Sequence, residues 1–320
     1  MSKSSFYDLI KILAMILVVI GHVTRMFTGY GIVNLNSNFI ISNINRVIYG
    51  FHMPLFMLIS GAVYYMCIND LNKYKNKREF VIQKFKRLII PYLIFGCFYV
   101  APIMVGFNFT NQSYIEYIIS GILLMKNNRH LWFLIYLFIY FVFSHLIFLK
   151  SHKHTKLIIM IMCIIISLFS ISYLSDISYY FIFFTLGYGL NRYYNKIICL
   201  IKKHKFQLLI LIPMYFLLIY INNSIMNCVT AIIGICIFLN IVYNFIPQCT
   251  YNIISKLKKY SMGIYLLHPM IIYILFIYIP QYINNDYIIA FLIFIISFCT
   301  SQILTVLIRK LKLQFIFGEK

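Results

Sequence analysis

The chain has 320 residues, of which 62% are hydrophobic and 11% are charged, and its net charge is +21. Soluble globular domains carry about 25% charged residues, so this composition excludes that class and indicates a polytopic membrane protein. The basic residues lie in short stretches between apolar runs, which is the positive-inside pattern of membrane proteins and not a nucleic-acid surface. We therefore expect a multi-pass protein of the cell membrane, in contact with lipid and without a nucleic-acid partner.

Ten apolar runs are long enough to be membrane spans, so we expect an all-α transmembrane helical bundle. Their expected bounds are 7–27, 46–67, 88–107, 130–149, 157–174, 179–194, 206–221, 225–246, 260–279 and 287–308. Ten spans put both termini on one side, and that side is assigned to the cytoplasm because most Lys and Arg residues fall there. The run 115–125 is too short to span and is expected to be interfacial or re-entrant. Residues 1–320 are expected to form a single membrane-embedded domain with no appended extracytoplasmic domain.

The eight cysteines are scattered, mostly inside apolar runs, and form no C-x-x-C pair. No spacing of His and Cys matches a set of metal ligands, so we predict neither a metal site nor a disulfide framework. We find no internal repeat of the kind that marks many secondary transporters. The classes left to separate are a membrane-embedded enzyme, a transporter and a non-catalytic scaffold.

The first apolar run, Phe6 to Phe27, contains four ionisable residues, although such groups are costly at membrane depth and usually functional. On a helix, Asp8, Lys11, His22 and Arg25 fall within one stripe about 100° wide. Lys11 and His22 differ by about 20° around the helix and lie about 16 Å apart along it. We predict a functional helix face here; the alternative is interfacial snorkelling of Asp8 and Lys11 beside a structural histidine.

Three further spans carry a histidine. His52 lies in the outer half of the second span, His130 and the only tryptophan, Trp132, open the fourth, and His268 lies near the middle of the ninth. A histidine at membrane depth needs a polar partner, so each is a candidate functional residue. The alternatives are a kinked packing helix for the second span and an ordinary interfacial aromatic residue for Trp132.

The loop 68–87 is the most basic stretch of the chain, and Lys84 and Arg87 end it. On a helix, residues three apart face the same way, so these two cations are expected to point together. Arg and Lys in such a place can hold the phosphates of a nucleotide-bearing donor. The alternative is topological charge, or contact with anionic lipid.

Taken in order, these residues resemble the motifs of the bacterial integral-membrane acyltransferase 3 family, over essentially the whole chain. The matching pieces are Lys11 and His22, His52 to Phe56 with Ser60 and Gly61, Lys84 and Arg87, His130 with Trp132 and Phe133, and Tyr265 to His268. At two of these positions Lys stands where the family more often has Arg. The charge is kept there, but bidentate recognition of phosphate or carboxylate is lost.

Members of this family modify surface glycans, so the resemblance implies an O-acyltransferase, most simply an O-acetyltransferase. A short acyl group, acetyl or succinyl, would pass from cytoplasmic acyl-CoA to a hydroxyl of an extracytoplasmic surface polysaccharide or lipid-linked glycan. The acyl-CoA is a substrate, and no bound cofactor is expected. The chain would complete the transfer itself or hand the acyl group to a partner, such as a glycan-assembly enzyme.

The resemblance also implies roles for individual residues. His22 would act as general base on the acceptor hydroxyl, or as the nucleophile of an acyl-histidine intermediate. Lys11 would orient the donor or stabilise developing negative charge, and Lys84 and Arg87 would bind the CoA phosphates. The acceptor-side candidates are His52, His268, Trp132, His130 and Arg25. The rival functions are a glycan-lipid transporter or flippase, and a non-catalytic membrane scaffold.

Overall fold

The structure is a computed structural model that describes residues 3–29, 31–33, 36–147, 152–168, 172–203, 205–221, 223–247, 251 and 254–319. Every regular element in these ranges is a helix. The α-helices are α1 (Lys3–Arg25), α2 (Phe39–Tyr49), α3 (His52–Tyr65), α4 (Lys77–Lys84), α5 (Ile90–Phe95), α6 (Ala101–Gly106), α7 (Tyr114–Glu116), α8 (Trp132–Leu146), α9 (Lys153–Leu168), α10 (Ser172–Arg192), α11 (Tyr194–Lys203), α12 (Leu208–Leu218), α13 (Ser224–Phe245), α15 (Ser261–Tyr278) and α16 (Asp286–Lys310). Turns of π-helix at Met66–Asp70, Phe85–Ile89, Gly96–Val100 and Tyr117–Leu123 extend α3, α4, α5 and α7.

Seven helical runs in the described ranges are long and apolar enough to cross a membrane. They are Lys3–Thr28, Phe39–Asp70, Lys77–Gly106, Arg129–Leu146, Ser224–Phe245, Ser255–Gln281 and Asp286–Lys310. These runs fall on the first four and the last three expected spans, and they identify the chain as a multi-pass membrane protein.

The other three expected spans coincide with helices α9, α10 and α12. Helices α9 and α12 have 16 and 11 residues, fewer than the roughly 20 that cross a bilayer at 1.5 Å per residue. Helix α10 has 21 residues, but Asp176, Asn191 and Arg192 lower its hydropathy. The all-helical fold is therefore confirmed, while ten spans and two cytoplasmic termini stay predictions.

The helices form two compact units. Unit 1 consists of Met1–Leu17, Arg46–Lys77 and Tyr140–Lys258, and unit 2 consists of Val18–Asn45, Arg78–Ile139 and Lys259–Lys320. Helix α1 is continuous, and it contributes residues 3–17 to unit 1 and residues 18–25 to unit 2. The expectation of a single functional domain stays a prediction.

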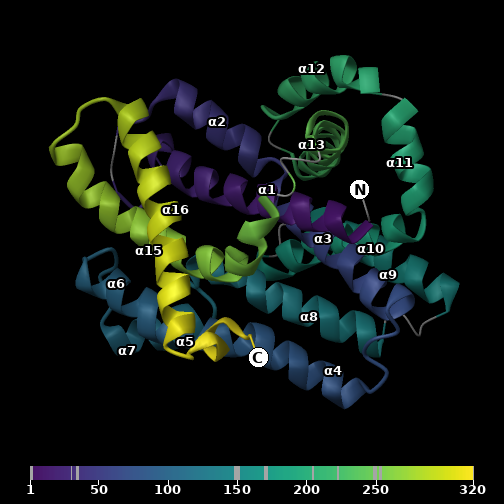
Figure 1. Cartoon of the computed structure of the whole chain (residues 1–320), viewed down its shortest axis with the longest axis horizontal. Coiled ribbons are helices and arrows are strands. Elements are labelled where there is room, and N and C mark those ends of the chain that lie inside the picture. The colour runs from purple at the N-terminus through teal and green to yellow at the C-terminus, as the bar shows by residue number, and fades with distance from the viewer. Residues whose placement is uncertain are drawn as a thin grey trace. The chain divides into compact units, whose positions relative to one another are not determined.

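Unit 1 is built around the close packing of α3 against α10, which lie side by side (Figure 1). A Cβ atom placed on Gly61 of α3 would overlap the carbonyl oxygen of Phe184, and one on Gly187 of α10 would overlap the carbonyl of Leu58. Small residues at such crossings let two membrane helices approach backbone to backbone. The two glycines therefore set the distance between these helices.

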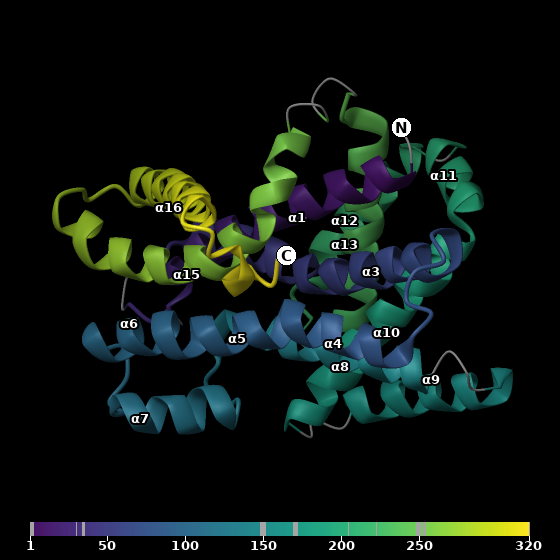
Figure 2. The ribbon, with the colours of Figure 1, turned by 60° about the horizontal axis from the view of Figure 1, so that its bottom comes forward.

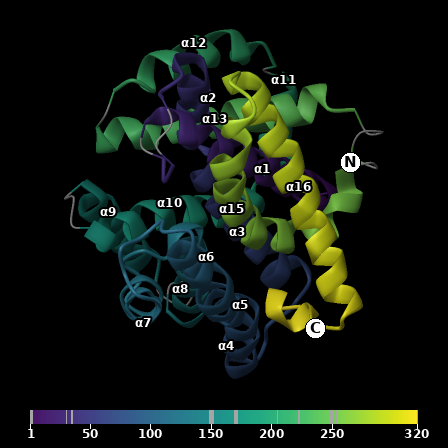
Figure 3. The ribbon, with the colours of Figure 1, turned by 90° about the vertical axis from the view of Figure 1, so that its left-hand side faces the viewer.

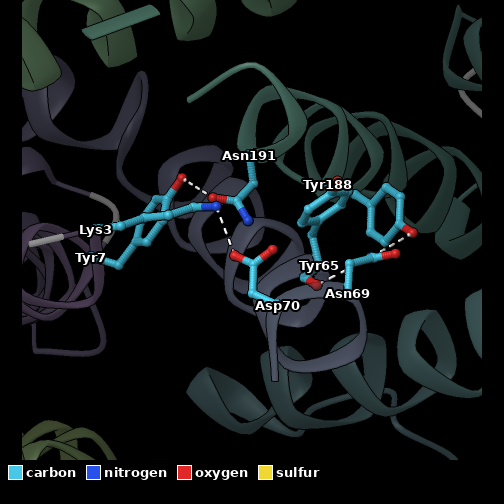
Figure 4. A network of polar contacts seen from close by, with 7 residues as sticks. All are labelled: Lys3, Tyr7, Tyr65, Asn69, Asp70, Tyr188 and Asn191. Atoms are coloured by element: carbon cyan, nitrogen blue, oxygen red, sulfur yellow. Dashed lines mark hydrogen bonds and ion pairs between the residues drawn. The ribbon is translucent and has the colours of Figure 1, made fainter. Parts of the chain in front are cut away.

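A polar network in unit 1 holds the start of α1 (Figure 4). The Lys3 ammonium pairs with the Asp70 carboxylate at 2.8 Å, and the Tyr7 hydroxyl donates to the side-chain oxygen of Asn191 at 2.8 Å. Tyr7 and Asn191 are both buried, where a polar group is costly unless it is hydrogen-bonded. The network therefore favours one position of α1 within the unit.

Unit 2 places α15 and α16 side by side (Figure 3), with Gly263 of α15 directly against Thr305 of α16. The helix Tyr114–Leu123, which includes α7, lies beneath α5 and its π-helical extension (Figure 2). The Tyr92 hydroxyl donates to the Ile122 carbonyl at 2.5 Å. The stretch 115–125 thus falls on a short apolar helix, with fewer residues than the roughly 20 that cross a bilayer, and its interfacial or re-entrant placement stays a prediction.

We expect the α3–α10 crossing to tolerate no side chain at Gly187. In Gly187→Ala the added methyl group meets the backbone of Leu58, so the free energy of unfolding should fall by about 1–3 kcal/mol. Gly189→Ala in the same helix is the matched control, because no neighbouring described atom lies within 4 Å of its Cβ position. Thermal unfolding in detergent measures both, and equal midpoints would contradict the packing argument.

Candidate functional site

Three histidines from three helical segments come together in unit 2. His22 lies in the last turn of α1, His130 in the short 3-10 turn before α8, and His268 in the middle of α15. Ring centroids are 5.1 Å apart for His22 and His268, 6.2 Å for His130 and His268, and 6.4 Å for His22 and His130. We call these residues the histidine cluster; it unites His22 with two candidates from the fourth and ninth expected spans.

Backbone carbonyls of α15 determine which ring nitrogen carries the proton in two of these histidines. His268 Nδ1 lies 2.7 Å from the Ile264 carbonyl oxygen, and His130 Nε2 lies 3.1 Å from that of Leu266. A carbonyl only accepts hydrogen bonds, so both nitrogens must be N–H donors. In the neutral rings, His268 Nε2 and His130 Nδ1 therefore carry the lone pairs. Both atoms are buried without a hydrogen-bond partner in the described part of the chain.

The same turn of α15 fixes the start of α8. Pro269 has no N–H, so the Tyr265 carbonyl has no helical donor. The Tyr265 hydroxyl donates to the His130 carbonyl oxygen in a short hydrogen bond. The Tyr99 hydroxyl donates to the Leu267 carbonyl at 2.8 Å. One turn of α15 is thereby bonded to the Tyr99 side chain and to the backbone of His130.

Helix α2 fixes the end of α1 that carries His22. The buried Asn45 amide donates to the Gly21 carbonyl at 2.9 Å and to the Thr24 hydroxyl at 3.0 Å. The Phe27 and Phe276 rings meet edge to face at 5.5 Å between α1's end and α15. Sequence reasoning missed Asn45, because the residue falls one position before the expected second span. The sequence signal that could have identified Asn45 is a polar amide within an otherwise apolar, amphipathic segment.

The structure confirms that Lys11 and His22 share one continuous helix. Lys11 is half-buried and Arg25 is exposed at the C-terminal end of α1. Lys11 belongs to unit 1, whereas His22 and Arg25 belong to unit 2. Trp132, half-buried at the start of α8, packs its ring 5.0 Å from that of Tyr136.

Lys84 and Arg87 differ in environment. Lys84 is 8% exposed, and its ammonium nitrogen lies 5.4 Å from the centre of the Phe80 ring. Arg87 is exposed, and it lies on the π-helical turn Phe85–Ile89 that follows α4. The two cations that we expect to point together thus differ in exposure: Arg87 is exposed and Lys84 is largely buried.

His52 belongs to unit 1, where it is buried at the start of α3. Its Nδ1 lies 2.9 Å from the Ile48 carbonyl oxygen, and the Tyr49 ring packs edge to face at 4.7 Å. Within the described ranges, no group of three or more His, Cys, Asp or Glu side chains could hold a metal ion. The roles assigned to the individual site residues stay predictions.

Comparison with known proteins identifies the family. The acyltransferase 3 family model, described as an acyltransferase domain, matches residues 4–310. The chain belongs to this acyltransferase family. Similar proteins occur in Staphylococcus aureus strains MSSA476 and MRSA252, each named "probable poly-beta-1,6-N-acetyl-D-glucosamine export protein". Both are 22% identical to this chain over 86% of its length and 84% of theirs. No solved structure matches the chain.

Removal of the Asn45 amide should loosen the helix turn that carries His22. Asn45→Ala leaves the Gly21 carbonyl and the Thr24 hydroxyl without this donor, so the unfolding free energy should fall by about 1–2 kcal/mol. Ile44→Ala, the exposed preceding residue of α2, is the matched control. The comparison is made by thermal unfolding of the detergent-solubilised proteins. A midpoint for Asn45→Ala at or above that of the control would contradict the anchoring role.

Proposed function

We propose that this protein is a membrane O-acyltransferase that moves acetyl, or another short acyl group, from acyl-CoA to a hydroxyl of an extracytoplasmic glycan. The observation that carries the proposal is the histidine cluster, formed by three segments of a chain that belongs to an acyltransferase family. Imidazoles can accept a proton from one group and return it to another, which acyl transfer to a hydroxyl requires. A scaffold without chemistry would not need three of them at membrane depth.

The proposed step is attack by the acceptor oxygen on the thioester carbonyl. His22 takes the proton of the hydroxyl as the new C–O bond forms. The C–S bond then breaks, and the proton passes from the imidazolium to the leaving CoA thiolate. An acyl-histidine intermediate is the alternative route, in which the His22 ring attacks first and the hydroxyl displaces it.

His268 is proposed to assist His22 through its second nitrogen. Its Nδ1–H is engaged with the Ile264 carbonyl, so Nε2 is the basic atom. The two rings lie 5.1 Å apart between centroids, close enough for the cluster to share one proton. Two protonated imidazoles at this distance would repel each other. The cluster is therefore expected to hold a single proton at a time during transfer.

Donor binding is proposed at the basic motif before α5. Arg87 is exposed and suits the CoA phosphates, since a guanidinium forms paired hydrogen bonds with phosphate oxygens. Lys84 is largely buried beside Phe80, and it adds a second positive charge three residues before Arg87. Lys11, on the same helix as His22, is proposed to orient the donor along α1.

The acceptor is proposed to be a surface polysaccharide or lipid-linked glycan. The name of the staphylococcal relatives makes a β-1,6-linked N-acetylglucosamine polymer the first acceptor to test. In such a polymer the linkages use carbons 1 and 6, and the amide occupies carbon 2. The hydroxyls left for acylation are those on carbons 3 and 4. Trp132 and the exposed Arg25 are the candidate residues for sugar and anion contact.

Glycan export is the second candidate function, because the relatives carry the word export in their name. A substitution in the site changes a different property of the surface glycan in an exporter than in an acyltransferase. Loss of an exporter lowers the amount of glycan at the cell surface. Loss of an acyltransferase leaves glycan on the surface without its base-labile acyl esters.

Substitution of His22 is the decisive test. In His22→Ala we expect acyl transfer to fall by about 100-fold or more, because a general base is lost. The measurement is the alkali-released acyl content per unit of surface glycan, with the membrane level of the protein followed in parallel. His152→Ala is the control, since this histidine is exposed and precedes α9. Normal acyl content with less surface glycan would favour export instead.

His268 should also be needed, through Nε2 alone. In His268→Asn the amide N–H can replace Nδ1–H as donor to Ile264, so the fold is kept while the basic nitrogen is removed. We expect a normal membrane level and a fall in transfer of about 100-fold. The assay is transfer of labelled acyl groups in membrane vesicles. Transfer within twofold of the unmodified protein would assign His268 to packing only.

A further inference from the structure

The segment that follows α16 folds back onto α5 within unit 2. We call residues 311–319 the strap; it contains the short 3-10 turn Gln314–Phe317. The Phe317 side chain is 1% exposed and stacks on the Phe95 ring, with centroids 5.7 Å apart and planes at 21°. Figure 1 shows this end of the chain beside α5. Burial of an aromatic ring indicates a defined position for the strap.

An ion pair closes the strap. Arg309, in the last turn of α16, donates from Nε to Glu319 Oε2 at 2.9 Å and from its terminal nitrogen to Oε1 at 2.6 Å. The same guanidinium donates to the Lys259 carbonyl oxygen. Paired charge-assisted bonds of this kind are stronger and more directional than single neutral ones. The end of the strap is therefore tied to α16 and to the turn before α15.

Between these two anchors, Gly318 lies against the backbone of Arg87. Its φ is +68°, a left-handed conformation that favours glycine. A Cβ atom here would lie 2.5 Å from the Arg87 carbonyl oxygen and 2.6 Å from the Arg87 Cα. The position therefore requires glycine for two reasons: its left-handed backbone angle and its close approach to the backbone of Arg87.

The part of the chain that Gly318 touches is the π-helical turn Phe85–Ile89. Turns of π-helix are rare and occur often at functional sites. Arg87, on this turn, is exposed, while Lys84, just before it, is buried. The strap reaches the one residue of the turn that the proposed function assigns to the donor phosphates.

We propose that the strap is a positioning element for the donor site, with Gly318 and Glu319 as positioning residues for Arg87. Gly318 holds the Arg87 backbone, Phe317 docks the strap on α5, and the Arg309–Glu319 pair keeps the docked strap closed. The inference rests on the proposed function, because Arg87 is taken there to bind CoA phosphates. It adds that the strap, which lies more than 200 residues after Arg87 in the sequence, sets the affinity for the donor.

The test is Gly318→Ala in the full chain, reconstituted in nanodiscs, with acetyl-CoA or succinyl-CoA as donor, whichever the unmodified protein uses. A small misplacement of a positioning group can cost up to about 100-fold. We expect the KM for the donor to rise about tenfold, with kcat within about twofold. The Kd for CoA itself should rise by the same factor as the KM. Gly106→Ala is the control, because no neighbouring described atom lies within 4 Å of its Cβ position.

Glu319→Gln provides a second variant that adds no atoms to the packed contact. It weakens the pair with Arg309 and should raise the donor KM in the same direction by about threefold. If the Gly318→Ala protein does not accumulate in the membrane, the same measurements of donor KM and CoA affinity on Glu319→Gln test the inference instead. If Glu319→Gln has the same donor KM and the same affinity for CoA as the unmodified protein, the inference is overturned.

Other outcomes separate this inference from the proposed function. If the unmodified protein transfers acyl groups and Gly318→Ala leaves donor KM and CoA binding unchanged, the strap has no positioning role and the proposed function stands. A fall in kcat alone, in proportion to the amount of folded protein, would also overturn the positioning role. If the unmodified protein neither transfers acyl groups nor binds CoA, the proposed function fails, and the inference fails with it.

Discussion

The arrangement of the histidine cluster depends on two hydrogen bonds between buried imidazoles and backbone carbonyls of α15. A buried polar ring is costly unless it is hydrogen-bonded, and Ile264 and Leu266 supply one acceptor each to His268 and His130. These bonds leave one basic nitrogen on each ring. A shift of α15 relative to the start of α8 would break the bond between His130 and Leu266, so the helices and loops packed around α15 act as supports of the site.

Helix α1 has a separate part in the molecule. It is unbroken from Lys3 to Arg25, and its two ends are held by different polar networks. Lys3 and Tyr7 are bound in unit 1, and Asn45 binds the turn next to His22 in unit 2. On a continuous α-helix, eleven residues correspond to a rise of about 16 Å, which is the axial spacing of Lys11 and His22 along α1.

The basic motif before α5 depends on a different kind of support. Arg87 lies exposed on a π-helical turn, and a glycine in the left-handed conformation packs directly on its backbone. Such a contact is possible only because Gly318 has no side chain. Phe317 and the Arg309–Glu319 pair hold that glycine in place. Local geometry at a candidate donor site is thus determined by residues remote in sequence.

The sequence by itself determined the class of protein, most of the helices, the single helix that carries Lys11 and His22, and the family motifs, because hydropathy and helical period are local properties. It placed His22, His130 and His268 on three helical segments without showing that their rings meet. It gave no signal for the Gly318–Arg87 contact. Only the tertiary structure decided these points. Contacts between residues 100 or more positions apart depend on how helices pack, and packing is set by side-chain shape across the whole fold.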